Sequence, residues 1–165
     1  MTTTLNGKAN LTGATFTGNV SVVGGSYGAW AQAPLNAVSY NTGNQTMTWA
    51  TLTNSNNITR AANTNSFQVS QAGTYVISCY IHISTIAAGA FQLIGRSSTN
   101  NSTWSNVLVS TGSGAYLASS TMTMQGIYTM AASSYFDIMI YNQTGGIATL
   151  YATTPNSYFH MYRTG

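Results

Sequence analysis

The chain has 165 residues but only four Lys or Arg, one Asp and no Glu, and its formal net charge is +3. One carboxylate cannot supply a general acid/base pair, the two carboxylates of glycoside hydrolysis or an oxygen-ligand cation site, so we expect a protein that is not an enzyme and holds neither cofactor nor metal. The few positive charges are scattered and no apolar run approaches the ~20 residues that span a bilayer, so we expect neither nucleic-acid binding nor membrane insertion.

Residues 1–30 differ in composition from the rest of the chain. Isolated apolar residues alternate there with Gly, Asn and Thr, a spacing that cannot build a core, and no charged n-region or apolar h-region of a signal peptide is present. The stretch resembles the Gly/Thr/Asn-rich runs of phage tail fibres. We expect an extended segment that anchors the protein to a partner through Leu5, Leu11, Phe16 and Val20.

Residues 31–165 show short alternating apolar runs separated by turn residues, which is typical of a β-sandwich or barrel. The polar positions hold Thr, Ser, Asn and Gly rather than the Glu, Lys, Gln and Arg of helix surfaces, so we expect an all-β domain. Pro34 and Pro155 fall outside the predicted strands, and the lone Cys79 is expected to be a buried, inert thiol. Strands are predicted at 37–41, 46–52, 57–61, 66–69, 74–84, 90–97, 104–110, 116–130, 135–142, 147–152 and 157–163.

Three of these runs, 74–84, 135–142 and 157–163, have two distinct faces. One face is apolar and predicts the core, since successive side chains of a strand point to opposite sides. The other face is rich in Tyr and His, although a sheet that faces water should be plainly polar there. We therefore expect a second copy of the chain to cover it, with the interface residues Val76, Tyr80, His82, Tyr135, Asp137, Tyr141, Tyr158, His160 and Tyr162.

Two segments carry a family resemblance. Residues 66–77, with Phe67, Val69, Gly73 and Tyr75, look like the F-x-V-x-x-x-G-x-Y element of tumour-necrosis-factor-like and complement-globular-head-like jelly rolls, and 135–159 resembles their last three strands. The resemblance implies an antiparallel jelly-roll sandwich of about ten strands that forms a homotrimer through the sheet holding the long central strand. The chain departs from that family in having no collagen-like stalk, no disulfide and almost no acidic residue for calcium.

Individual residues leave alternatives open. His82 and His160 favour an interface or core role over a metal site, because no ligand cluster accompanies them. For Asp137 the favoured role is to accept hydrogen bonds from Tyr hydroxyls or Arg in the interface, and the alternative is a ring of symmetry-related carboxylates that binds a cation on the axis. Trp104 and Tyr116, in loops, either contact a glycan or belong to simple exposed turns.

Taken together, these features predict a trimeric virion structural protein that decorates a phage capsid as a cement or head-fibre protein and binds the major capsid protein or another virion protein. The alternative is the receptor-binding tip of a tail fibre that recognises host glycans. The short segment before the sandwich favours decoration, because a tail fibre normally carries a long shaft. We expect the protein on the virion surface.

Overall fold

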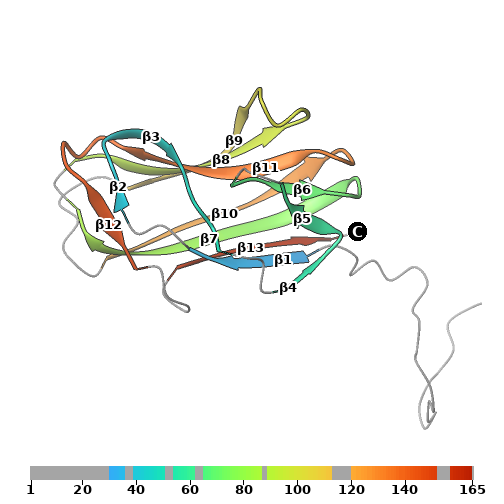
Figure 1. The fold of residues 1–165 in the computed structure, drawn as a ribbon, viewed down its shortest axis with the longest axis horizontal. Coiled ribbons are helices and arrows are strands. Elements are labelled where there is room, and N and C mark those ends of the chain that lie inside the picture. Colours follow the sequence, from blue (N-terminus) through green and yellow to red (C-terminus); the bar gives the residue numbers. More distant parts are fainter. Residues whose placement is uncertain are drawn as a thin grey trace, which may run out of the picture.

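A computed structural model describes residues 30–35, 39–50, 54–61, 65–86, 89–112, 120–151 and 157–164. This part of the chain is built of antiparallel strands in two layers (Figure 1). The strands are β1 (Trp30–Pro34), β2 (Ser39–Tyr40), β3 (Gly43–Thr46), β4 (Asn54–Asn56), β5 (Ile58–Arg60), β6 (Phe67–Val69), β7 (Gly73–Thr85), β8 (Phe91–Ser98), β9 (Ser105–Gly112), β10 (Ser120–Met130), β11 (Tyr135–Asn142), β12 (Ala148–Leu150) and β13 (Tyr158–Arg163). The expected all-β sandwich is confirmed.

The first sheet is organised around the long strand β7. It pairs along one edge with β10 and along the other with β13 and β12, and the sheet continues from β13 through β1 to β4. The central strand and the final strand therefore lie side by side, as the family resemblance implies.

The second sheet has the order β5-β6-β11-β8-β9, with β3 also paired to β11. Strand β11 pairs with β8 over its whole length, from Tyr135 opposite Ser98 to Asn142 opposite Phe91. The last-but-two predicted strand, 135–142, thus belongs to the layer opposite β7.

The core fills the space between the two sheets. The predicted inward faces of β7, β11 and β13 are all buried there: Tyr75, Ile77, Cys79, Ile81, Ile83, Phe136, Ile138, Ile140, Phe159 and Met161. Phe67 stacks on Phe159 with ring centroids 4.3 Å apart, so the rings join the sheets across the core. Burial raises the pKa of the Cys79 thiol, which is consistent with the expected inert side chain.

Three strand predictions need correction. The predicted strand at 46–52 lies earlier, at 43–46, and the chain then leaves the sheet so that Trp49 can enter the core. Residues 54–56, which lie between two predicted strands, form strand β4, and the predicted strand at 57–61 starts one residue late because Asn57, with a φ of 57°, redirects the chain into β5 of the other sheet. Pro34 ends β1, although it was expected outside the strands, and it is tolerated because β4 pairs only with residues 30–32, so no described neighbour on that side requires its missing N–H.

Among the described residues, no helix has the length and apolar character that crossing a membrane would require.

Candidate functional site

Ten outward side chains of β7, β10 and β13 form one continuous surface, here called the aromatic face. The strand register arranges them in cross-strand rows, such as Ile127–Val76–Tyr162. None of the ten is Lys, Arg, Asp or Glu, and Ile127 and Tyr162 are 68% and 42% exposed. The set is Val76, Ser78, Tyr80, His82, Thr123, Gln125, Ile127, Tyr158, His160 and Tyr162.

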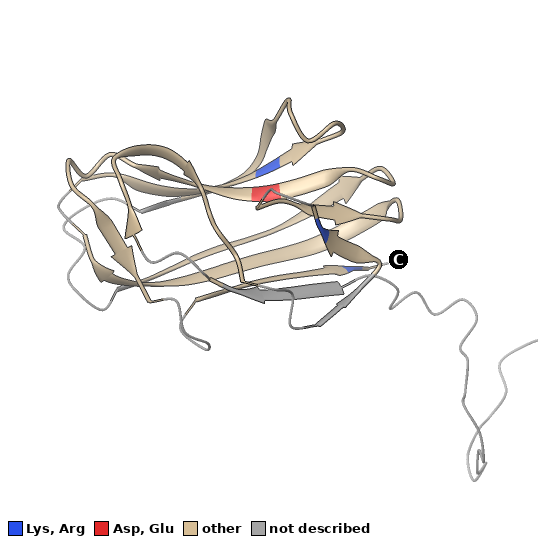
Figure 2. Ribbon diagram, viewed as in Figure 1, with Lys and Arg blue, Asp and Glu red and all other residues tan. Residues whose placement is uncertain are grey.

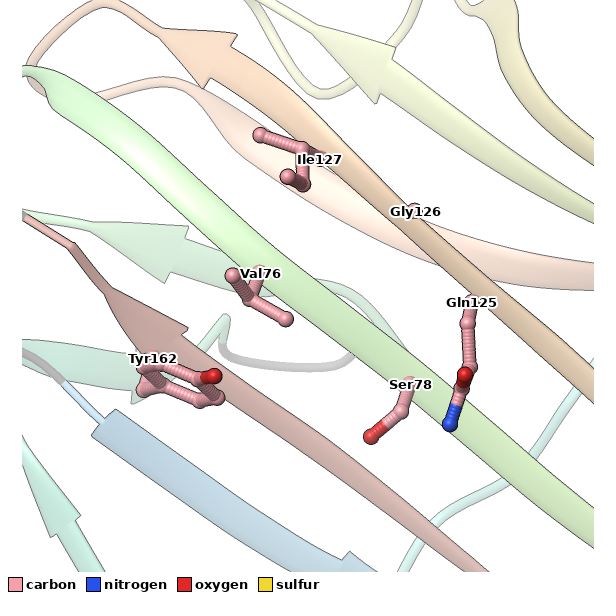
Figure 3. A pocket seen from close by; sticks show the side chains of 6 residues that line it. All are labelled: Val76, Ser78, Gln125, Gly126, Ile127 and Tyr162. Atoms are coloured by element: carbon pink, nitrogen blue, oxygen red, sulfur yellow. The ribbon is translucent and has the colours of Figure 1, made fainter.

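A hollow of about 490 Å³ lies on this face between β10 and β13. Val76 and Ser78 form its floor on β7, and Ile127, Gln125 and Tyr162 stand at its sides (Figure 3). An open hollow with apolar and neutral polar walls can receive side chains from another protein surface.

The aromatic rings of this face are ordered by contacts with one another. Tyr80 and Tyr158, directly opposite in the register, stack with centroids 5.5 Å apart, and His82 lies 4.7 Å from the ring of Tyr151. The Nε2 atom of His82 is buried and has no hydrogen-bond partner among the described residues. A buried polar atom without a partner among the described residues is costly, which makes His82 an unusual residue of this face.

The nine expected interface residues do not share one face. Val76, Tyr80, His82, Tyr158, His160 and Tyr162 lie together on the aromatic face, whereas Tyr135, Asp137 and Tyr141 lie on the outside of the second sheet. The expectation of a single face is wrong because β11 pairs with β8 and not with β7 or β13.

Asp137 forms a paired contact with Arg96, its direct neighbour across β11 and β8. Arg96 donates from Nε to Oδ1 at 2.8 Å and from Nη2 to Oδ2 at 2.5 Å, and it also donates from Nη2 to the hydroxyl of Thr46 at 3.0 Å. The two residues appear in Figure 2 as a red segment of β11 beside a blue segment of β8. The favoured prediction, that Asp137 accepts hydrogen bonds from Tyr or Arg in an interface, is confirmed only as to an Arg donor, because Arg96 belongs to the same chain and the contact lies on the second sheet.

The carboxyl of Asp137 is buried, with only 4% of the side chain exposed. This burial raises its pKa above the ordinary value of 3.8, while the hydrogen bonds and positive charge of Arg96 act in the opposite direction.

Trp104 lies beside this ion pair. The guanidinium of Arg96 stands 5.2 Å from the centroid of the indole ring, a cation–π contact. Around them is a pocket of about 250 Å³, lined by Thr46, Asn65, Ser66, Arg96, Asn101, Trp104 and Asp137. The structure therefore brings Trp104 and Asp137 together, although the sequence assigned them to different roles.

Five predicted site residues lie outside the described residues: Tyr116, Leu5, Leu11, Phe16 and Val20. Within the described ranges, no three His, Cys, Asp or Glu side chains gather in a way that could hold a metal ion.

Two residues of these surfaces escaped sequence reasoning. Ile127 is the one apolar residue on the otherwise polar outer side of β10. Side-chain alternation in the sequence could have revealed it, because its neighbours on that side are polar. Arg96 stands 41 residues from Asp137, so only strand pairing reveals that they meet.

No family model and no curated protein matches the sequence. Solved structures do match: three crystal structures of murine APRIL, determined at pH 5.0, 8.5 and 8.0, align with TM-scores of 0.66, 0.64 and 0.62. Each alignment covers 82% of this chain and 98% of the APRIL chain, at sequence identities of 8%, 9% and 7%.

The chain shares the jelly-roll fold of these structures, an antiparallel β-sandwich. This confirms the antiparallel jelly-roll sandwich that the resemblance of residues 66–77 and 135–159 implied, although the described residues form thirteen strands and not about ten. At 7–9% identity the likeness concerns the fold alone.

Proposed function

We propose that this TNF-like jelly roll is a non-enzymatic structural protein that forms a homotrimer through its aromatic face and decorates the surface of a phage capsid. One observation supports the trimer. The aromatic face has no Lys, Arg, Asp or Glu and is partly apolar, and Ile127, beside the hollow, is 68% exposed. A second copy of the same face is a suitable partner, because neither surface brings a like charge to the contact.

Sedimentation of the purified chain tests the trimer. We expect a mass three times that of the chain, and we expect Ile127→Arg to give monomers because it places three charges at the shared contact. Val109→Arg is the matched control, since Val109 is also well exposed, at 58%, but lies on β9 of the second sheet. A monomeric wild-type protein at micromolar concentration, or a trimer that survives Ile127→Arg, contradicts the proposal.

The position on the capsid rests on residues 1–30, whose sparse apolar residues suit an extended segment that orders on a partner. Trp30 already belongs to β1, so the deletion should stop at residue 29. Deleting residues 1–29 should leave the trimer intact and abolish attachment to the particle, measured by co-sedimentation with capsids that lack the protein. Counting the copies per virion separates the alternatives: hundreds support decoration, and a small multiple of three supports a tail-fibre tip.

A further inference from the structure

We propose that the pocket around Arg96, Asp137 and Trp104 binds one ring of an uncharged saccharide. The pocket lies on the outside of the second sheet, whereas the aromatic face belongs to the first. The proposal therefore does not depend on the trimer or on attachment to a capsid.

The size of the pocket restricts the ligand to a small group. Its volume of about 250 Å³ is below the ~300–1,000 Å³ of sites that enclose drug-sized ligands, so it can hold one ring but not an extended chain. The rest of a longer glycan would extend into solvent.

The charge of the pocket indicates a neutral ligand. The carboxylate of Asp137 and the guanidinium of Arg96 neutralise each other through two parallel hydrogen bonds, and among the described residues no other charged side chain lines the pocket. An anionic ligand would compete with Asp137 for Arg96, and a cationic ligand would compete with Arg96 for Asp137.

Hydrogen-bonding groups remain available on both sides of this ion pair. No hydrogen bond within the described part of the chain engages Nη1 of Arg96 or Nδ2 of Asn101, so both can donate. Each oxygen of Asp137 accepts one bond from Arg96, although a carboxylate has about four acceptor positions. A set of fixed donors beside fixed acceptors matches adjacent sugar hydroxyls, because a hydroxyl both donates and accepts.

Trp104 supplies the apolar wall that a sugar ring needs. Arg96 lies over the indole at 5.2 Å and holds its orientation, and the ring also lines the pocket. The face of an aromatic ring is electron-rich, so it attracts the weakly positive C–H groups of a pyranose.

The loop that carries these groups is already ordered without a ligand. Oδ1 of Asn100 accepts hydrogen bonds from the backbone N–H of Ser102 at 3.0 Å and of Thr103 at 2.9 Å. The hydroxyl of Ser66 donates to Oδ1 of Asn101 at 2.9 Å and connects the loop to the start of β6. A preformed site loses little entropy on binding, which favours even a small ligand.

The test is a titration of the full-length protein with the methyl glycosides of glucose, galactose, mannose and N-acetylglucosamine, followed by the NMR signal of the Trp104 indole N–H. We expect at least one glycoside to shift this signal saturably, with a dissociation constant of about 1 mM, as is reasonable for a single ring. Methyl glucuronide, which is an anion, and glucosamine, which is a cation, serve as charged comparison ligands. We expect both to bind more weakly than the neutral glycoside.

Two variants locate the binding. Trp104→Ala removes the apolar wall, and Asn101→Gly removes the amide while accepting the backbone φ of 58°. Each should weaken binding at least about tenfold, whereas Trp104→Phe and the control Val109→Ala, outside the pocket, should bind within about threefold of wild type. Saturation-transfer signals of the sugar provide the readout in variants without the indole, and the amide spectrum verifies that each variant is folded.

Three results would overturn the proposal: no neutral glycoside shifts the Trp104 signal, a charged sugar binds better than every neutral one, or binding persists in folded Trp104→Ala and Asn101→Gly. Sedimentation of the same samples reports separately on the trimer, so failure of one proposal is not mistaken for failure of the other.

Discussion

At the scale of single residues, the ion pair of Arg96 and Asp137 dominates the electrostatics of the described chain. Asp137 is the only acidic side chain in the sequence, and it is buried next to a guanidinium that reaches both of its oxygens. Removing one partner of a buried pair leaves an uncompensated charge, which costs more than removing both.

We therefore expect Arg96→Met to lower the free energy of unfolding by about 3–5 kcal/mol, and the double variant Arg96→Met/Asp137→Leu to recover most of that loss. Denaturant unfolding at one fixed protein concentration measures both values, because oligomerisation would otherwise alter the apparent stability. Equal losses in the single and double variants would show that the buried charge is not the source of the cost.

The same carboxyl gives a pH dependence with a definite sign. Its pKa is raised in the folded protein, so the folded state binds the proton more tightly than the unfolded state does. The contribution of Asp137 to stability is therefore complete below the ordinary value of 3.8 and decreases as the pH rises from there through the raised pKa. Asp137→Asn should remove this decrease, measured as the difference between the two unfolding-against-pH curves; parallel curves would contradict it.

At the scale of elements, the β7–β8 connection and the β11–β12 turn are hydrogen-bonded to each other at one end of the sandwich. The N–H of Gln143, after β11, donates to the carbonyl of Ala90, before β8, at 2.9 Å. The buried side chain of Asn142 joins this region to β2, since its Nδ2 donates to the carbonyl of Tyr40 at 3.2 Å. The connection before β8 must therefore approach the β11–β12 turn closely.

Gly89 makes that approach possible. A Cβ atom there would lie 2.6 Å from the Cα of Thr144 and 2.8 Å from the carbonyl oxygen of Gln143, and the φ of 143° adds strain. We expect Gly89→Ala to lower the free energy of unfolding by about 3 kcal/mol, because backbone atoms cannot rotate away.

Gly145→Ala is the matched control in the neighbouring turn. It also has a positive φ, of 71°, but nothing lies within 4 Å of the added atom. Only the cost of the left-handed conformation remains, about 1 kcal/mol, so denaturant unfolding should separate the two variants. Similar losses in both would mean that the close backbone contact does not matter.

At the scale of the whole molecule, the proposed assembly should respond little to salt. The aromatic face contains tyrosine, histidine, small polar and aliphatic side chains and no Lys, Arg, Asp or Glu. Salt weakens association where exposed charges attract each other, and this surface has none to screen.

We expect the trimer to persist between about 0.1 and 1 M NaCl, over which the Debye length falls from about 10 to 3 Å. Sedimentation velocity at constant protein concentration measures the distribution of species. Dissociation at high salt would instead indicate an interface built on ion pairs, away from the aromatic face.

The sequence by itself determined the fold class and the inner face of the main strands. Side-chain alternation is a local property of a strand, so it identified Ile77, Phe136 and Phe159 as core residues without knowledge of strand pairing. The scarcity of charge also showed that catalysis needing two carboxylates has no residues to carry it.

Only the tertiary structure decided which strands share a sheet. Strand pairing depends on hydrogen bonds between segments far apart in the chain, and the alternation of side chains along one strand does not show which strands pair. For this reason Asp137 was assigned to the face of Tyr80, whereas pairing of β11 with β8 places it on the other sheet beside Arg96 and Trp104. The saccharide pocket that we propose arises from that long-range pairing.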